Sequence, residues 1–237
     1  GKNNPLDQTA TPESLKERAM QKNMNPKMLA SFVDGSKTMI EMTSLSNGIG
    51  LPLDRVGMNG PVSEVSELNK NLIPKSDGGV LEESGRVDFA FGPAPGVFSI
   101  ITTDNPTIIE EMEYLSMGEG PYYTLYRPYH LASVEAPRSV GMAIINNEPG
   151  LQPTTWISEV VGHAKKDLKP GDKIDGIGGF SSYGVAYPYS ETNGLAPLGL
   201  IEGATVVGDI KQGEPIPRDS IELPDNLINN LRNKQNN

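Results

Sequence analysis

Two short stretches of this sequence repeat each other and decide the fold of its C-terminal part. Residues 167–174 read Asp-Leu-Lys-Pro-Gly-Asp-Lys-Ile, and residues 209–216 read Asp-Ile-Lys-Gln-Gly-Glu-Pro-Ile, 42 positions later. Both copies contain, in the same order, Asp, an aliphatic residue, Lys, Gly, an acid and Ile. This order is typical of a strand, a tight glycine turn and a second strand. Two copies predict a small, compact β domain with pseudo-twofold character, closed by residues 219–223.

The remaining sequence divides into recognisable segments. Residues 146–153 (Asn-Asn-Glu-Pro-Gly-Leu-Gln-Pro) predict a domain linker, and the Asn-rich residues 224–237 predict a tail or frayed helix. Apolar residues recur at helical spacing over 27–47, which predicts the best helix of the chain. Gly, Pro, Asn and Ser interrupt residues 48–86, so we expect a long loop with one short helix near 62–69, and loops of that length are more often functional than idle.

The middle of the chain mixes both element types. Val87–Phe91 and Val97–Thr103 predict two strands, and Tyr122–Tyr126 predicts a third. Residues 107–117 follow an Asp-Asn-Pro start signal and predict a helix, as does at least the second half of residues 127–145. The fold class predicted for the whole chain is α+β.

Composition excludes several functional classes. The 237 residues contain 20 Lys and Arg against 30 Asp and Glu, a net charge of −10, which disfavours nucleic acid as a partner. With no cysteine there is no disulfide, thiolate nucleophile or Cys-ligated metal. The longest apolar run is far below the ~20 residues that span a bilayer. We expect a cytoplasmic protein that does not enter a membrane.

One candidate site lies on the predicted helix 27–47. On a helical wheel Asp34, Lys37 and Glu41 share one polar arc opposite the apolar residues. The arc has two interpretations: a solvated face with an Asp34–Lys37 pair, or a lysine between carboxylates that passes a proton to a substrate oxygen or, through the acids, holds a divalent cation.

A second candidate site is the tyrosine-rich stretch from Gly120 to Glu135. Tyr122, Tyr123, Arg127, His130 and Glu135 fall within it. Hydrogen-bonding aromatics with an arginine clamp and a histidine acid or base suit a pocket for a polar, anionic small molecule. The alternative is that the tyrosines pack at a sheet edge and His130 contacts Glu135 structurally.

Other features predict structure. His163, within a predicted strand, is expected to be structural or exposed, and Trp156 is expected to pack in a core or interface. Gly176-Ile177-Gly178-Gly179 has no following helix or Lys-Ser/Thr pair, so it predicts a turn and not a phosphate loop. Because no Gly-x-Gly-x-x-Gly occurs, we expect no dinucleotide site within this chain.

Several segments, taken together in this order, resemble the homoserine-dehydrogenase-like NAD(P)-dependent oxidoreductases that end in a SAF domain, and in particular the deoxyxylulose-phosphate reductoisomerase-like enzymes of isoprenoid synthesis. The segments are Gly1-Lys2-Asn3-Asn4-Pro5-Leu6, Asn25-Pro26-Lys27-Met28-Leu29, Ser31-Phe32-Val33-Asp34-Gly35-Ser36-Lys37-Thr38-Met39, Gly120-Pro121-Tyr122-Tyr123 through Arg127-Pro128-Tyr129-His130-Leu131, and Ala164-Lys165-Lys166-Asp167-Leu168-Lys169-Pro170-Gly171.

The resemblance implies a domain order. Residues 1–150 would form the substrate and dimerisation region, with residues 1–10 a remnant of a Rossmann cofactor domain that precedes them in full-length members. Residues 154–223 would form a SAF domain of the β-clip kind, and 224–237 a tail. The chain would then be the C-terminal part of a homodimeric or larger homo-oligomeric enzyme, inactive by itself.

The resemblance also implies residue roles. Lys37 would be the general acid with Asp34 as its partner, and His130 a further catalytic residue. Lys2 and Asn3 would lie near the nicotinamide of NAD(P)H. The substrate-binding residues would be Arg127, Glu135, Tyr122, Tyr123 and Glu41.

The expected function is NAD(P)H-dependent reduction of a small polar carbonyl compound, with no metal ligand assigned. One alternative is a metal-dependent reductoisomerase acting on a sugar phosphate, in which Asp34, Glu41 or Glu135 would hold a divalent metal. Another is a non-catalytic SAF module that binds carbohydrate or serves assembly.

Overall fold

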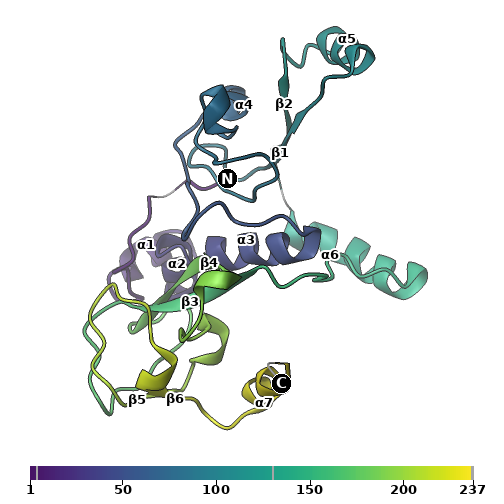
Figure 1. Ribbon diagram of the computed structural model, residues 1–237. Helices are drawn as coiled ribbons and strands as arrows, with labels where there is room; N and C mark the ends of the chain where they lie inside the picture. Colours follow the sequence, from purple (N-terminus) through teal and green to yellow (C-terminus); the bar gives the residue numbers. More distant parts are fainter. Residues whose placement is uncertain (4, 130, 236–237) are drawn as a thin grey trace.

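The computed structural model describes residues 1–3, 5–129 and 131–235. Within them the chain forms helices and three separate two-stranded antiparallel sheets (Figure 1), so the predicted α+β class is confirmed. In chain order the elements are α1 (Lys16–Gln21), α2 (Pro26–Val33), α3 (Ser36–Ile49), α4 (Leu68–Asn71), β1 (Val97–Thr102), α5 (Pro106–Tyr114), β2 (Tyr122–Arg127), α6 (Ala132–Gly141), β3 (Ser158–Ala164), β4 (Ser182–Pro188), β5 (Thr205–Val206), β6 (Ile221–Glu222) and α7 (Leu227–Gln235).

The two copies of the repeat pair with each other in the β region, defined here as residues 158–222. Leu168 and Ile210 hold equivalent positions and exchange backbone hydrogen bonds of 2.8 and 3.1 Å. At the equivalent turns, Gly171 (φ +96°) and Gly213 (φ +83°) adopt the left-handed conformation that favours glycine. The glycine turns are as predicted, but single bridges flank them instead of full strands.

The twofold relation extends beyond the repeat. The Gly171 amide donates to the Val206 carbonyl at 2.8 Å, and the Gly213 amide donates to the Ala164 carbonyl at 2.8 Å. Ala164 and Val206 are themselves 42 residues apart, like the two glycines. Equivalent residues therefore make equivalent bonds, which confirms the predicted pseudo-twofold character.

One hydrophobic core joins the β region to the helices that precede it. Met39 of α3 is buried in the same cluster as Val160 of β3 and Ile201. The Ser36 hydroxyl at the start of α3 accepts a hydrogen bond from the Gly184 amide of β4 at 2.8 Å. As Figure 1 shows, α3 lies along β3 and β4, so this contact fixes the position of the α2–α3 junction.

The predicted single helix over residues 27–47 is wrong, because the chain forms two helices there. α2 ends at Val33 and α3 begins at Ser36. Between them Gly35 has φ +90°, which interrupts helical hydrogen bonding. The break reorients Asp34 relative to α3, so the helical wheel that grouped Asp34 with Lys37 does not apply.

The long loop after α3 contains the predicted short helix, displaced toward its C-terminal side. A 3-10 turn at Val65–Glu67 leads directly into α4. The predicted strand Val87–Phe91 is wrong: Val87 and Phe91 form only isolated bridges, with Leu53 and with Lys2 and Val62 respectively, since no continuous strand lies beside them. β1 and β2 do pair, with Val97 opposite Arg127.

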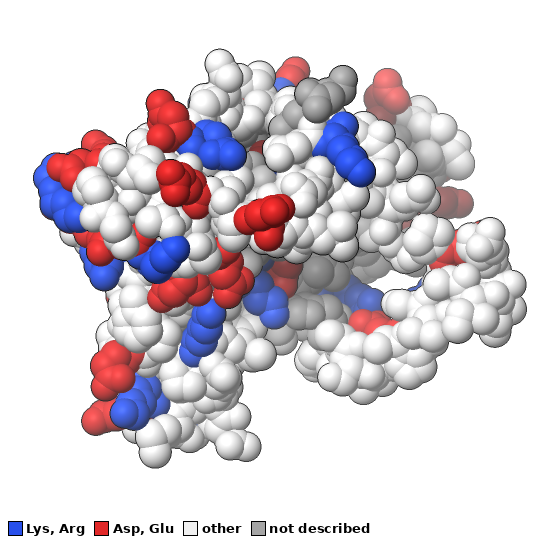
Figure 2. Space-filling model, turned by 90° about the horizontal axis from the view of Figure 1, so that it is seen from below, with Lys and Arg blue, Asp and Glu red and all other residues white. Residues whose placement is uncertain are grey.

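Two helical segments project from this body, and we call them the arms: α5, and the segment from α6 through Asn146 (Figure 1). Neither arm contains a buried residue among those described. Figure 2 shows the right-hand projection as largely uncharged surface, whereas charged side chains gather on the opposite side. Across the described residues, no helix has both the length and the apolar character that a bilayer crossing requires.

His163 is a structural residue of the β region, as predicted. Its Nδ1 lies 2.9 Å from the Gly213 carbonyl, which only accepts, so Nδ1 carries the proton. Nε2 then accepts from the Tyr187 hydroxyl at 2.9 Å. Burial lowers the pKa of the His163 imidazole, and the Gly213 hydrogen bond opposes that shift.

Candidate functional site

Asp34 lies at the α2–α3 junction and is almost fully buried, with 1% of the residue exposed. Its Oδ1 accepts from the Ser36 amide at 2.8 Å, and its Oδ2 lies 2.8 Å from Nζ of Lys165. Lys165 is equally buried and also donates to the carbonyls of Ala10 (2.6 Å) and Gly179 (2.9 Å). The predicted pairing of Asp34 with Lys37 is therefore wrong, because the cation that faces Asp34 directly follows β3 and lies 131 residues later in the chain.

Lys37 and Glu41 keep the proximity that their spacing predicts. The Lys37 Nζ lies 4.0 Å from a Glu41 carboxylate oxygen and 4.3 Å from the centre of the Phe32 ring. About half of each charged side chain is exposed, 43% for Lys37 and 52% for Glu41. Lys37 is thus an oriented cation that a small molecule can reach.

Lys2 joins the same group of charges from the N-terminal segment. Its amide donates to the Ala90 carbonyl at 2.8 Å, its carbonyl accepts from Gly92 at 2.9 Å, and its Nζ donates to the Phe32 carbonyl. Burial lowers the pKa of the Lys2 ammonium, while the carboxylates of Asp34 and Glu41 oppose the shift.

The structure therefore brings together four of the residues singled out in the sequence. We call Lys2, Asp34, Lys37 and Glu41 the charged cluster. Asn3, the other predicted cofactor-binding residue, is exposed beside it. Lys165 was missed as a member of this neighbourhood, because a helical wheel contains no information about residues distant in sequence.

The tyrosine-rich stretch is arranged differently from the pocket predicted there. Tyr123 is fully buried, whereas Tyr122 donates to the Asp77 carboxylate, and that hydrogen bond raises the pKa of the Tyr122 hydroxyl. Arg127 forms an exposed ion pair with Glu135, which lowers the pKa of the Glu135 carboxyl. His130 lies outside the described residues.

In the described part of the chain, the charged cluster and Arg127 have separate ion-pair partners. Lys37 faces Glu41, Asp34 faces Lys165, and Arg127 faces Glu135. The connection between the two regions is the loop of residues 92–96. Its Gly96 carbonyl accepts from the Gly1 nitrogen at 2.9 Å, and its Pro93 carbonyl lies 3.5 Å from the Tyr126 hydroxyl.

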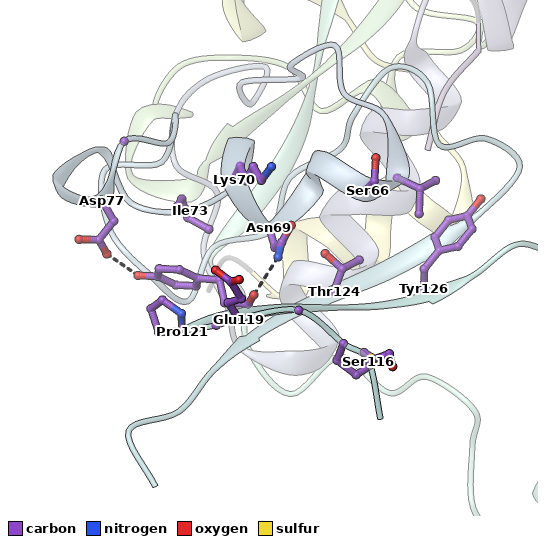
Figure 3. A pocket seen from close by; sticks show the side chains of 16 residues that line it. Ser66, Asn69, Lys70, Ile73, Asp77, Ser116, Glu119, Pro121, Thr124 and Tyr126 are labelled. Atoms are coloured by element: carbon purple, nitrogen blue, oxygen red, sulfur yellow. Dashed lines mark hydrogen bonds between the residues drawn. The ribbon is translucent and has the colours of Figure 1, made fainter. Parts of the chain in front are cut away.

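A cavity of about 1150 Å³ opens beside β2 (Figure 3). The Asn69 side chain of α4 spans its wall by donating to the Tyr122 carbonyl at 2.8 Å, and the Tyr122 hydroxyl reaches Asp77. Among the predicted site residues that the structure describes, Tyr122 alone lines it. Asn69, Lys70 and Asp77 were missed, although they belong to the long loop 48–86, whose length predicts a functional role.

Carboxylates do not converge on a metal position in the residues described. No group of three or more His, Asp or Glu side chains there could hold one ion. Asp34, Glu41 and Glu135, the three acids considered for a metal, each face a different cation. They therefore do not act as a common ligand set in this arrangement.

Comparison with known proteins shows which family the chain belongs to. A protein-family description, "Oxidoreductase DRL, catalytic domain", matches residues 1–136, which include the charged cluster, the wall of the large cavity and the Arg127–Glu135 pair. The comparison with curated proteins finds no match. Since the match covers more than half of the sequence, the chain belongs to this family and carries an oxidoreductase catalytic domain.

Proposed function

We propose that this chain supplies the substrate side of an NAD(P)H-dependent reductase that acts on a small polar carbonyl compound. The observation that carries the proposal is the exposed Lys37 ammonium, held between Glu41 and the Phe32 ring inside the matched oxidoreductase segment. Reduction of a carbonyl leaves negative charge on its oxygen, and a positioned ammonium stabilises that charge and donates the proton.

Asp34 has a positioning role in this proposal. Its carboxylate holds the Ser36 amide and the Lys165 ammonium, which sets the start of α3 one residue before Lys37. Glu41 keeps the Lys37 side chain oriented, and Lys2 adds positive charge to the same neighbourhood.

The two segments that lead from a strand into α5 and α6 lack the glycines that a dinucleotide pyrophosphate site needs. The segments that lead from β1 into α5 and from β2 into α6, residues 103–105 and 128–131, contain no glycine. A dinucleotide pyrophosphate needs close backbone approach at a helix N-terminus, which glycine permits. The proposal therefore places the cofactor's phosphates outside these residues.

Two further proposals concern the β region and the arms. We propose that residues 154–223 are a SAF domain of the β-clip kind, which the pseudo-twofold bonding of the repeat supports. We also propose a cytoplasmic homodimer or larger homo-oligomer whose subunits meet through the arms. Apolar side chains on α6 and the turn after it support this, because Val134, Val140, Ile144 and Ile145 are all more than half exposed.

The test is hydride transfer by the complete protein. We expect oxidation of NADPH or NADH with a panel of phosphorylated and unphosphorylated hydroxycarbonyl compounds. Lys37→Met should lower kcat by about 10²–10⁴-fold, the usual contribution of a general acid. Lys22→Met, which changes an exposed lysine after α1, is the matched control and should leave kcat unchanged.

Two results would overturn or redirect the proposal. If Lys37→Met retained turnover within a few-fold of the unaltered protein, Lys37 would not be the proton donor. If a chelator abolished turnover and Mg²⁺ or Mn²⁺ restored it with a sugar phosphate as substrate, the reductoisomerase alternative would replace the simple reductase.

A further inference from the structure

A second cavity, of about 230 Å³, lies between the β region and α7. It is smaller than the ~300–1,000 Å³ of typical drug-sized ligand sites, so it fits a small molecule. None of its lining residues belongs to the charged cluster or to the matched segment 1–136. A ligand here would be additional to the proposed substrate.

Asn229 of α7 lines this cavity and carries an unused acceptor. Only 5% of the residue is exposed. Its Nδ2 donates to the Pro224 carbonyl at 2.8 Å and lies 3.5 Å from the Leu200 carbonyl. Because both partners only accept, the amide orientation is fixed, and Oδ1 points away from them without a hydrogen-bond partner among the described residues. A buried acceptor of this kind can accept one further hydrogen bond from a group outside the described chain.

Arginine side chains give the cavity a positive character in a chain whose net charge is −10. Arg218 donates to the Ile221 carbonyl at 3.3 Å, and within the described part of the chain no carboxylate lies within ion-pair distance of it. Arg232 lies 2.5 Å from the Glu159 carboxylate. The cavity lining thus holds two guanidinium groups and one carboxylate, and that carboxylate pairs with Arg232, which leaves Arg218 available for an anion.

Two residues that line the cavity, Arg232 and Tyr189, contact a tryptophan that provides an optical signal. Arg232 lies 4.2 Å from the Trp156 ring, and the Tyr189 ring lies 4.5 Å from Trp156. Trp156 is the single tryptophan of the chain. A change in the position or charge environment of Arg232 should therefore alter the tryptophan fluorescence.

We propose that this cavity binds a small anionic hydroxy compound, which is a carboxylate or phosphate with a neighbouring hydroxyl group. Arg218 would bind the anionic group, and Asn229 Oδ1 would accept the hydroxyl proton in a hydrogen bond. The proposal concerns binding alone and does not depend on the proposed reductase activity.

The experiment titrates the 237-residue chain with four probes while Trp156 fluorescence is recorded. Glycerol 3-phosphate and glycerate carry both an anion and hydroxyls, inorganic phosphate carries only the anion, and glycerol carries only hydroxyls. We expect a saturable signal with at least one of the first two, at concentrations at least tenfold below those needed for phosphate or glycerol. Which of the two binds more tightly identifies the anion.

Variants separate a binding role from an anchoring role for α7. Arg218→Gln should weaken binding at least tenfold without changing Tm, and Arg138→Gln on α6 is the matched control, expected to bind as before. Glu159→Gln should tighten binding, because it frees Arg232 for the anion. If the Glu159–Arg232 ion pair only anchors α7, Glu159→Gln would lower Tm and leave the affinity for the probes unchanged, which would overturn the proposal.

Two further outcomes would also overturn it. One is the absence of a saturable signal with all four probes. The other is an equal response to glycerol 3-phosphate and inorganic phosphate that Arg218→Gln does not diminish, since this would be a general ionic effect.

Discussion

The β region and the arms differ in how far their apolar side chains are buried. In the β region aliphatic residues such as Leu168, Ile210 and Ile216 are buried, and equivalent residues satisfy one another by pseudo-twofold bonds. In the arms no described residue is buried, and Ile144 and Ile145 are 76% and 83% exposed. These aliphatic residues of the β region are thus buried within it, whereas the apolar side chains of the arms lie at the surface.

The largest loss of stability is expected when the buried Asp34–Lys165 ion pair is broken. Lys165→Met leaves the Asp34 carboxylate buried without its cation, and breaking a buried pair in this way costs about 3–5 kcal/mol. Lys166→Met changes the exposed neighbour and should cost little. The measurement is the free energy of unfolding in urea. Equal stability of the two variants would show that the Asp34–Lys165 pair does not secure the α2–α3 junction.

A smaller effect, on self-association, is expected when apolar residues of the arms are changed. Val140→Glu combined with Ile144→Glu should weaken self-association about tenfold or more, because each places a charge in an apolar contact. Tm at protein concentrations where only monomer is present should not change, since neither residue contributes to the core. Light scattering coupled to size-exclusion chromatography gives the mass. An unchanged oligomer would refute the arms as the contact.

A smaller, pH-dependent effect is expected within the β region. Because burial lowers the pKa of His163 below its usual 6.5, the unfolded chain binds the proton more readily than the folded one. Stability should therefore fall as the pH drops below about 6.5 toward the folded-state pKa, and recover as it rises. His163→Gln should remove this component when urea unfolding is compared at pH 7.5 and 5.5. A variant with the same pH dependence as the unaltered chain would contradict the assignment.

The smallest effect tests the symmetry of the repeat. Lys169 pairs with Asp209 at 3.0 Å, and Lys211 pairs with Asp167 at 3.3 Å, in equivalent positions on the surface. Lys169→Met and Lys211→Met should each lower Tm slightly, by similar amounts, and salt should diminish both changes. Clearly unequal changes in calorimetry would show that the twofold relation stops at the backbone.

The accuracy of sequence-based prediction follows the range of the interactions involved. Lys37 and Glu41 are four residues apart on one helix, so their proximity was predictable and is confirmed. Asp34 is close to both in sequence, yet the glycine that follows it ends the helix, and its cation comes from residue 165. The strand predicted at Val87–Phe91 fails for a related reason, since a strand needs a continuous neighbour that local sequence does not specify.

Local sequence was enough to predict the glycine turns, the pseudo-twofold β region and a helix that carries Lys37 and Glu41. These features depend on backbone preferences and on spacing within a few residues or within a repeat. The packed chain alone reveals that Asp34 is buried against Lys165, that Arg127 pairs with Glu135, and that Asn229 lines a cavity beside Arg218. Charges and hydrogen-bond acceptors find their partners through space, and the chain brings those partners from positions that no local pattern encodes.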